Sequence, residues 1–307
     1  MKIGVQTRGI LTRLGIDAGM RAIAEAGFET VDFNTDYELS YGDIVAGHTH
    51  SVFDGTEADV AAAMKPFRAA ADKYGLTVGQ MHAPYPTYVN DATTDAYLQR
   101  AMSKCAAACE ALGCGHLVVH PAFLQYDQAL SPEREWQLNM ERYGALIPSL
   151  KRYGVTCCLE NMFVNYKTGR GGRKIIGACC SDPHEAARYI DELNAMAGEK
   201  RFAFCFDTGH ALLLGMDAVR TLGILGSRVE CLHLHDNNAL EDQHLAPYMG
   251  VMDWDAVIRG LKAIGYAGNL SFETYNTLNV FDEALLPECL RLICAAGRLF
   301  RTRLSEA

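Results

Sequence analysis

Ionisable side chains follow short apolar segments at six places along this 307-residue chain. In chain order they are His82, His120, Glu160, Asp207, His210, His233, His235, Asp242, His244 and Glu273. Carboxylates that gather at one place repel each other unless they are protonated or bound to metal. A mixed set of carboxylate oxygens and imidazole nitrogens suits Mn, Mg, Co, Zn or Fe(II) rather than copper or a thiolate site. The pattern therefore predicts a divalent-metal site, provided that the fold brings these residues together.

Alternation inside the apolar segments indicates how they are placed. In 202–207, one face is small and ends in Asp207, and the other face carries three phenylalanines. Because successive side chains of a strand point to opposite faces, the bulky face suits packing under helices and the small face suits the interior of a barrel. Segments 155–160, 229–233 and 269–273 repeat the pattern, and each small face ends in an ionisable residue. Barrel enzymes build their sites at this C-terminal end of the strands.

Short strand-like segments alternate with longer amphipathic ones. The predicted strands are 2–6, 30–34, 77–82, 116–120, 155–160, 202–207, 229–233 and 269–273. Helical periodicity is clear in 95–112, 134–152 and 282–300. Eight strands that alternate with helices imply a parallel sheet, and the simplest closed form is a single α/β (β/α)8 TIM barrel. No linker or shift of composition divides the chain, so one domain over 1–307 is predicted.

Single residues of this pattern have simpler interpretations. One histidine at a strand end is more often a hydrogen-bonded core or loop residue than a ligand. An aspartate before a helix is usually an N-cap, and Asp207 fits that description. Ionisable residues at six consecutive strand ends are hard to explain by packing alone, and this recurrence favours a shared metal-centred site.

Composition sets the broad class of protein. The formal charge of −9 gives no general attraction to phosphate backbones or anionic lipid, so neither a nucleic-acid partner nor a membrane partner is expected. No secretory signal and no apolar run of about 18 residues is present. The 11 cysteines lie mostly in apolar segments without C-x-x-C pairs, as reduced core cysteines do. A cytoplasmic location is expected.

The order of short motifs resembles a known superfamily. The motifs are H-A-P-Y, H-P, L-E-N, D-T-G-H, H-L-H-D, D-x-H-L-x-P and F-E. Together they resemble the xylose-isomerase-like TIM barrels, which include sugar phosphate isomerases/epimerases, ketose 3-epimerases, inosose-processing enzymes and endonuclease IV. The resemblance covers nearly the whole chain. It is specific in the last four strands and weak in the first two.

The resemblance implies roles for individual residues. The four metal-ligand positions of ketose 3-epimerases fall on Glu160, Asp207, His233 and Glu273, and His210 takes the position of a substrate-contacting histidine. The three-metal cluster of endonuclease IV maps onto His82, His120, Glu160, Asp207, His210, His233, Asp242, His244 and Glu273. One divalent ion (Mn, Co, Mg or Zn) is therefore expected, with two to three Zn as the alternative. Homo-oligomers are common among the similar proteins, which leaves a homo-oligomer open here.

The sequence also departs from both relatives. Tyr166 stands where the epimerase pattern has a glutamate, and Ala239 stands where it has an arginine. Pro86 follows Tyr85 where endonuclease IV would carry a bulky DNA-wedging residue, and the opening IGVQTRG differs from the N-terminal motif of that family. These departures put specific ketose contacts and DNA contacts in doubt.

Two loops on the predicted rim each have two interpretations. Residues 35–54, with His48 and His50, are either a lid that excludes water or a solvated loop. Residues 166–175 carry a basic group that is either an anion clamp for a substrate phosphate or carboxylate or an exposed basic loop. The predicted substrate contacts of this second loop are Lys167, Arg170 and Arg173. The loop lacks P-loop spacing.

The predicted function is that of a metal-dependent isomerase or epimerase acting on a sugar, sugar phosphate or inosose. Glu160 and Glu273 would transfer protons at a small polyhydroxy carbonyl substrate, with His210 as the third catalytic residue. Lyase or dehydratase chemistry fits the same residues. The alternatives are an endonuclease IV-like zinc phosphodiesterase acting on abasic DNA and a non-catalytic sugar-binding barrel, which would not need paired carboxylates.

Overall fold

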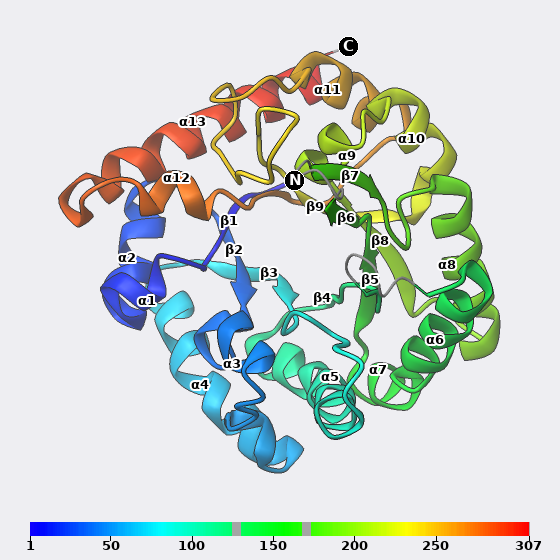
Figure 1. Cartoon of the computed structure of the whole chain (residues 1–307). Coiled ribbons are helices and arrows are strands. Elements are labelled where there is room, and N and C mark those ends of the chain that lie inside the picture. The colour runs from blue at the N-terminus through cyan, green and yellow to red at the C-terminus, as the bar shows by residue number, and fades with distance from the viewer. Residues whose placement is uncertain (125–129, 168–172, 307) are drawn as a thin grey trace.

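A ring of eight parallel strands forms the centre of the molecule (Figure 1), in a computed structural model that describes residues 1–124, 130–167 and 173–306. The strands are β1 (Ile3–Gln6), β2 (Thr30–Asn34), β3 (Thr77–His82), β4 (His116–Val118), β5 (Thr156–Glu160), β8 (Phe202–Asp207), β9 (Val229–His233) and β10 (Leu270–Phe272). Their order is β10-β1-β2-β3-β4-β5-β8-β9. The ring closes just beyond β9, where the Leu234 amide donates to Ser271 O at 2.8 Å and Leu234 O accepts from the Glu273 amide at 3.1 Å. The predicted (β/α)8 barrel is confirmed.

Helices follow every strand and form the outer layer (Figure 1). They are α1 (Leu11–Leu14), α2 (Ile16–Glu25), α3 (Tyr41–Val45), α4 (Glu57–Lys73), α5 (Ala92–Leu112), α6 (Pro132–Gly144), α7 (Ile147–Tyr153), α8 (Pro183–Ala197), α9 (Thr208–Leu213), α10 (Ala218–Leu225), α11 (Trp254–Ala263), α12 (Tyr275–Asn279) and α13 (Leu286–Ser305). None of the described helices is long and apolar enough to cross a lipid bilayer.

Several element boundaries differ from the prediction. The fourth strand ends at Val118, so His120 lies two residues beyond it. The predicted helix 134–152 is two helices, because Pro148 lacks an amide hydrogen and begins a new helix in the first turn of α7. The last helix begins only at Leu286, after the short 3₁₀ turn Glu283–Leu285.

The two faces of the strands pack as their residues predict. Phe202, Phe204 and Phe206 are fully buried in the core under the helices. On the other face, small side chains form a separate cluster that fills the barrel. Its members are Val118, Cys158, Ala203, Cys205 and Cys231. All 11 cysteines are free and buried, which confirms their prediction as core residues.

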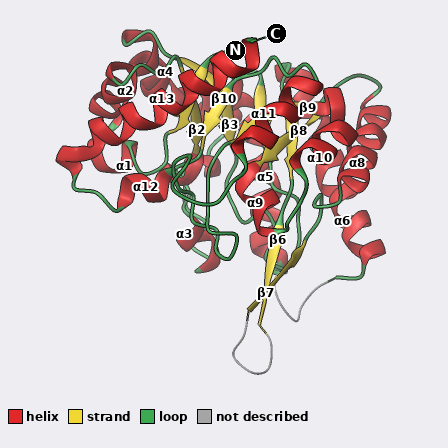
Figure 2. Ribbon diagram, turned by 90° about the horizontal axis from the view of Figure 1, so that it is seen from above, coloured by secondary structure: helices red, strands yellow, loops and turns green. Residues whose placement is uncertain are grey.

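The segment after β5 was expected to be a loop, and its described ends are strands. β6 (Phe163–Lys167) and β7 (Arg173–Gly177) pair antiparallel and project from one end of the barrel (Figure 2). Aromatic and β-branched residues in β6 and the two isoleucines of β7 favour extended backbone, a signal that the glycine-rich stretch between them conceals. Lys167 lies opposite Arg173 in the backbone register of the two strands, whereas Arg170 lies outside the described residues. The anion clamp stays a prediction.

Residues 35–54 are largely structured. They form two 3₁₀ turns, Thr35–Tyr37 and Val52–Asp54, on either side of α3. His48 is exposed. The His50 side chain is 99% exposed, and its Nδ1 lies 3.0 Å from Asp54 Oδ2. The solvated interpretation of the two histidines therefore holds.

Candidate metal centre

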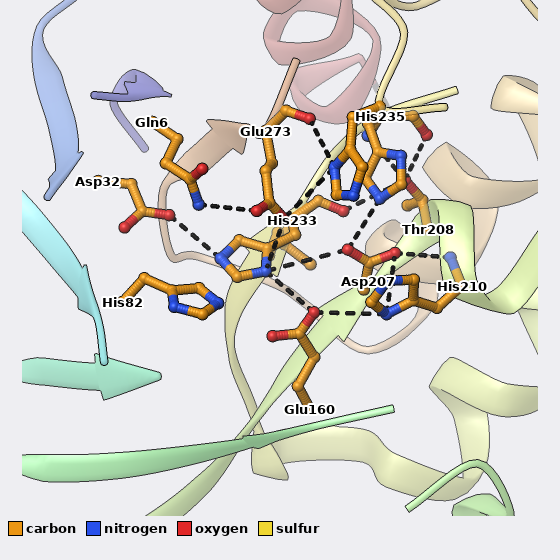
Figure 3. Close-up of polar contacts among 12 residues, drawn as sticks. Gln6, Asp32, His82, Glu160, Asp207, Thr208, His210, His233, His235 and Glu273 are labelled. Atoms are coloured by element: carbon orange, nitrogen blue, oxygen red, sulfur yellow. Dashed lines mark hydrogen bonds and ion pairs between the residues drawn. The ribbon is translucent and has the colours of Figure 1, made fainter. Parts of the chain in front are cut away.

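Four ligand-type side chains meet at the C-terminal ends of the last strands. Glu160, Asp207 and His233 are the final residues of β5, β8 and β9, and Glu273 follows β10 directly. One nitrogen or oxygen atom from each lies within 4.8 Å of the others. The four side chains point toward one another (Figure 3). Glu160, Asp207 and His233 have no exposed surface, and Glu273 is buried. The structure thus places the four predicted metal ligands together in a buried position.

His233 stands at the centre of the four. Its Nδ1 lies 3.1 Å from Glu160 Oε1, 3.3 Å from Glu273 Oε2 and 3.9 Å from Asp207 Oδ2. Among the described residues, no hydrogen bond of suitable geometry reaches His233 Nδ1 or either carboxylate oxygen of Glu160, although an imidazole nitrogen lies 3.1 Å from each of these oxygens. Buried polar and charged atoms without partners are strongly unfavourable. A cation bound between these atoms would satisfy them together, so the donor set fits a divalent metal ion.

Neighbouring histidines favour the ionised form of two carboxylates of this centre, Glu160 and Glu273. Burial acts to raise the pKa of Glu160, but the charges of His233 and His120 outweigh it and hold the pKa well below its usual range. Burial also opposes ionisation of Glu273, yet His233 and His244 lower the pKa of this carboxyl to about 2. Ionised carboxylates are the form that binds a metal ion or accepts a proton.

A second set of residues orients the proposed metal ligands His233 and Glu273, and the sequence analysis did not identify Asp32 or Gln6 as members of it. Asp32 Oδ2 lies 3.1 Å from His233 Nε2 and also accepts from Gln80 Nε2 at 3.1 Å. Gln6 Nε2 donates to Glu273 Oε1 at 2.9 Å. If His233 Nε2 carries the proton, its Nδ1 lone pair faces the carboxylates, as in a metal-bound histidine. Gln6 and Asp32 lie near the ends of β1 and β2, so the strand-end rule applied to the later strands would have found them.

Asp207 serves two purposes. Its Oδ1 accepts from the backbone amide of His210 at 2.7 Å, so the N-cap interpretation of Asp207 is right. Its Oδ2 lies 2.9 Å from His235 Nε2 and faces the metal-ligand group. The N-cap hydrogen bond therefore holds the Asp207 carboxylate in place and leaves its Oδ2 available as a metal ligand. His235 packs so closely on Gly209 that a Cβ there would lie 1.9 Å from the ring.

Further ligand-type groups adjoin the first, and two of them bring in residues from the surrounding rim. One is formed by His210, His235, Asp242 and His244, and the other by His82, His120 and Glu160. His82 Nδ1 faces Ala83 O at 2.7 Å, and since a carbonyl only accepts, the lone pair of Nε2 faces His120 Nε2 at 3.0 Å. Burial and the neighbouring His120 lower the pKa of His82, which keeps it neutral. All ten ionisable residues predicted to share a site therefore lie at one end of the barrel.

A cavity of about 220 Å³ lies over this centre. Further side chains form part of its wall, among them Asp36 and Tyr41 of the segment 35–54 that was predicted to lie on the rim. These further side chains include Arg8, Asn34, Asp36, Tyr41, Tyr85 and Tyr275. The Arg8 guanidinium lies 4.2 Å from the centre of the Tyr275 ring, and its Nε lies 3.4 Å from Asp36 Oδ2. The contact between Arg8 and Tyr275 joins residues that are far apart in the chain, so no local sequence pattern predicts it.

Residues 20–293 match the family described as xylose isomerase-like TIM barrel. The chain belongs to this family. An uncharacterized protein of Methanocaldococcus jannaschii is 25% identical over 300 residues, which cover 95% of this chain and 90% of the relative.

Two solved barrels show how the xylose isomerase-like fold is shared. A D-tagatose 3-epimerase-like protein is 21% identical with a TM-score of 0.67, over 96% of this chain and 99% of its own. The 3-keto-D-glucoside 4-epimerase of E. coli is 18% identical with a TM-score of 0.71, over 97% and 99% of the two chains. The family predicted from the motifs is confirmed, and these likenesses show the fold alone.

Proposed function

We propose that this protein is a divalent-metal-dependent isomerase or epimerase that acts on a polyhydroxy carbonyl compound such as a keto sugar. One observation carries the proposal. Two ionised, buried carboxylates, Glu160 and Glu273, stand on strands three apart around the barrel and both face His233 Nδ1 under the cavity. The similar solved structures support it, because two of them are named as an epimerase or an epimerase-like protein.

Glu160, Asp207, His233 and Glu273 would hold the ion. When bound, a divalent ion supplies a Lewis acid that polarises a carbonyl and makes the neighbouring C–H more acidic. One of the two glutamates then removes that proton, and the other returns a proton from the opposite side, which inverts the carbon. The same proton removal gives a lyase or dehydratase reaction when the substrate carries a leaving group beside the carbanion position.

His210 is placed to serve a substrate oxygen. Its Nδ1 lies 2.9 Å from Asn161 O and donates to it, so Nε2 is left on the side of Asp242, at 3.7 Å from Oδ2. Burial acts against its charge, but Asp207 and Asp242 raise the pKa of His210 well above the ordinary value. A protonated imidazole there can donate to a hydroxyl or carbonyl oxygen in the cavity.

Exchange with heavy water tests the proposal directly. Metal-loaded protein is incubated in D2O with ketohexoses, inososes and 3-keto-glycosides, and NMR follows replacement of C–H by C–D beside the carbonyl. We expect exchange with at least one compound. Glu160→Gln and Glu273→Gln should each lower its rate by about 10²–10⁴-fold. Glu241→Gln, an exposed rim variant, should leave the rate unchanged. No exchange with any compound, or full exchange in both active-site variants, contradicts the proposal.

A second candidate function is a multinuclear zinc phosphodiesterase that acts on abasic DNA. The observation that favours it is the pair of additional ligand-type groups, around His82–His120 and around His244–Asp242. In such an enzyme these residues would hold further zinc ions that clamp a phosphate. Cleavage of a duplex with a single abasic site would support this function, and the number of metal ions per chain separates it from the first.

A further inference from the structure

A second hollow adjoins the cavity over the metal centre. It has a volume of about 190 Å³ and shares Tyr41 and Tyr85 with that cavity. Its remaining wall is mainly apolar and is formed by Val45, Pro86, Val89, Pro121, Phe123 and Leu124, together with Thr87 and Tyr88. Figure 2 shows α3, which carries Tyr41 and Val45, at the same end of the barrel as the β6–β7 hairpin. The hollow therefore opens beside the reaction cavity.

Aromatic rings connect the two spaces. The ring centres of Tyr41 and Tyr85 are 5.7 Å apart with 30° between their planes, and the Tyr85 ring lies 4.6 Å from that of His120. His120 Nε2 in turn lies 3.1 Å from Glu160 Oε2. A flat group that extends from a substrate over Glu160 would thus meet ring surfaces continuously as it passes into the hollow.

Part of this surface faces solvent. Tyr41 is 46% exposed and Val45 is 58% exposed. Contiguous exposed apolar surface next to a functional cavity typically marks a binding surface. A ligand group that covers both side chains would remove this surface from water.

The side chains that line the hollow determine which kind of ligand group binds there. None of the described residues that line it is charged, and the Tyr88 hydroxyl already donates to Asn90 Oδ1 at 2.9 Å. A second sugar ring would lose water from its hydroxyls, and the described lining offers it no charged side chain in exchange, only the hydroxyls of Thr87 and the tyrosines. An apolar ring gains from burial instead. The cavity of about 220 Å³ alone is smaller than the ~300–1,000 Å³ typical of ligand pockets, and the two spaces together reach that range.

We propose that the substrate is a keto glycoside, with its carbonyl on the sugar ring: the apolar, ring-bearing aglycone lies in the hollow between Tyr41 and Leu124, while the sugar ring lies over Glu160 and Glu273. This inference rests on the proposed function and narrows its substrate class. The hollow positions the substrate and does no chemistry.

A pair of probes tests the aglycone site. Binding of phenyl β-D-glucopyranoside and of methyl β-D-glucopyranoside to the Mn²⁺-loaded protein is measured by calorimetry. We expect the phenyl glycoside to bind about tenfold more tightly or better, because only its ring can be buried in the hollow. Val45→Asp places a carboxylate at the edge of the hollow and should reduce the preference to less than about twofold. Val251→Asp, at a valine that is 62% exposed and lines neither space, should preserve it.

Three results overturn the assignment: equal affinity for the two probes, a phenyl preference that survives in Val45→Asp, or no binding of either. Failure of the proposed function looks different. A phenyl preference that is sensitive to Val45→Asp, without any C–H exchange in D2O, would leave the aglycone site standing in a protein of another activity. Thermal unfolding of both valine variants checks that each is folded.

Discussion

His233 Nε2 lies 3.1 Å from Asp32 Oδ2, and the opposite nitrogen of the same ring faces Glu160 Oε1 at 3.1 Å. The imidazole therefore bridges a carboxylate that orients it and a carboxylate that shares its proposed ion. Asp32 comes from the second strand and His233 from the seventh of the barrel, so the link crosses the interior. It fixes which nitrogen is free for a metal.

Replacing Asp32 tests this link. We expect Asp32→Asn to lower metal affinity by about 10–100-fold, because partners that orient a ligating histidine typically contribute that much. Asp36→Asn, a change at a nearby carboxylate that pairs with Arg8 and touches no proposed ligand, should leave affinity unchanged. Competition titration of Co²⁺ against a chelating dye measures both. Equal affinity in Asp32→Asn and in the unaltered protein would show that His233 is oriented by other contacts.

Metal content separates the two candidate functions. We expect one divalent ion per chain by elemental analysis of protein purified without chelators, and none in a His233→Ala variant. His244→Ala should retain the ion, since this residue belongs to the neighbouring group rather than to the proposed four ligands. Removal of the ion should lower the free energy of unfolding by about 3 kcal/mol at 100-fold excess over Kd. Two to three zinc ions, lost in part by His244→Ala, would favour the phosphodiesterase.

The sequence was most informative where one rule applied locally. Side-chain alternation in 202–207 predicted both the phenylalanine face under the helices and the small face inside the barrel, because a strand has a period of two. The same rule placed Glu160 and His233 at strand ends, and parallel strands bring their C-terminal ends to one rim. The positions of the strands and of the ionisable residues at their ends were therefore predictable from the same rule.

Other features depend on contacts that no short window contains. Asp32 was missed because the first two strands resemble the family only weakly, although its strand end carries the same signal. The stacking of Tyr41 on Tyr85 depends on how α3 folds back over the rim, and the pairing of Arg8 with Tyr275 joins opposite ends of the chain. The β6–β7 hairpin was hidden by a glycine-rich basic stretch that composition alone reads as a loop.

Close packing behind Asp207 predicts the effect of a one-carbon change. A Cβ at Gly209 would lie 1.9–2.6 Å from three atoms of the His235 ring, which holds Asp207 Oδ2. We expect Gly209→Ala to destabilise the protein by about 1–3 kcal/mol through overpacking and to weaken metal binding. Gly223→Ala, in α10 with nothing near the added carbon, should instead stabilise by about 0.5–1 kcal/mol. Urea unfolding and metal titration of both variants test the comparison, and similar results for the two would contradict it.

An ion pair toward the N-terminal ends of the strands predicts how stability depends on pH. His116, the first residue of β4, places Nε2 3.2 Å from Glu230 Oε2, and this contact raises the pKa of His116 to about 9. Because the folded-state pKa exceeds the ordinary value of about 6.5, the stabilisation is complete below about pH 6.5 and is lost as pH rises through about 9. Glu230 determines how the stability contributed by this ion pair changes at acidic pH. Its pKa is lowered by His116 and Lys200, so its contribution is present above its ordinary pKa and is lost as pH falls through the folded value.

The corresponding variant is His116→Gln, which removes the charge. We expect a loss of about 1 kcal/mol near pH 6, since about a third of the side chain is exposed and solvent screens the pair. The difference from the unaltered protein should vanish near pH 10, where the histidine is neutral in both folded and unfolded states. Urea unfolding at the two pH values measures it, with His184→Gln, an exposed histidine at the start of α8, as the control. A constant difference across this pH range would mean that His116 stabilises the barrel by packing rather than by charge.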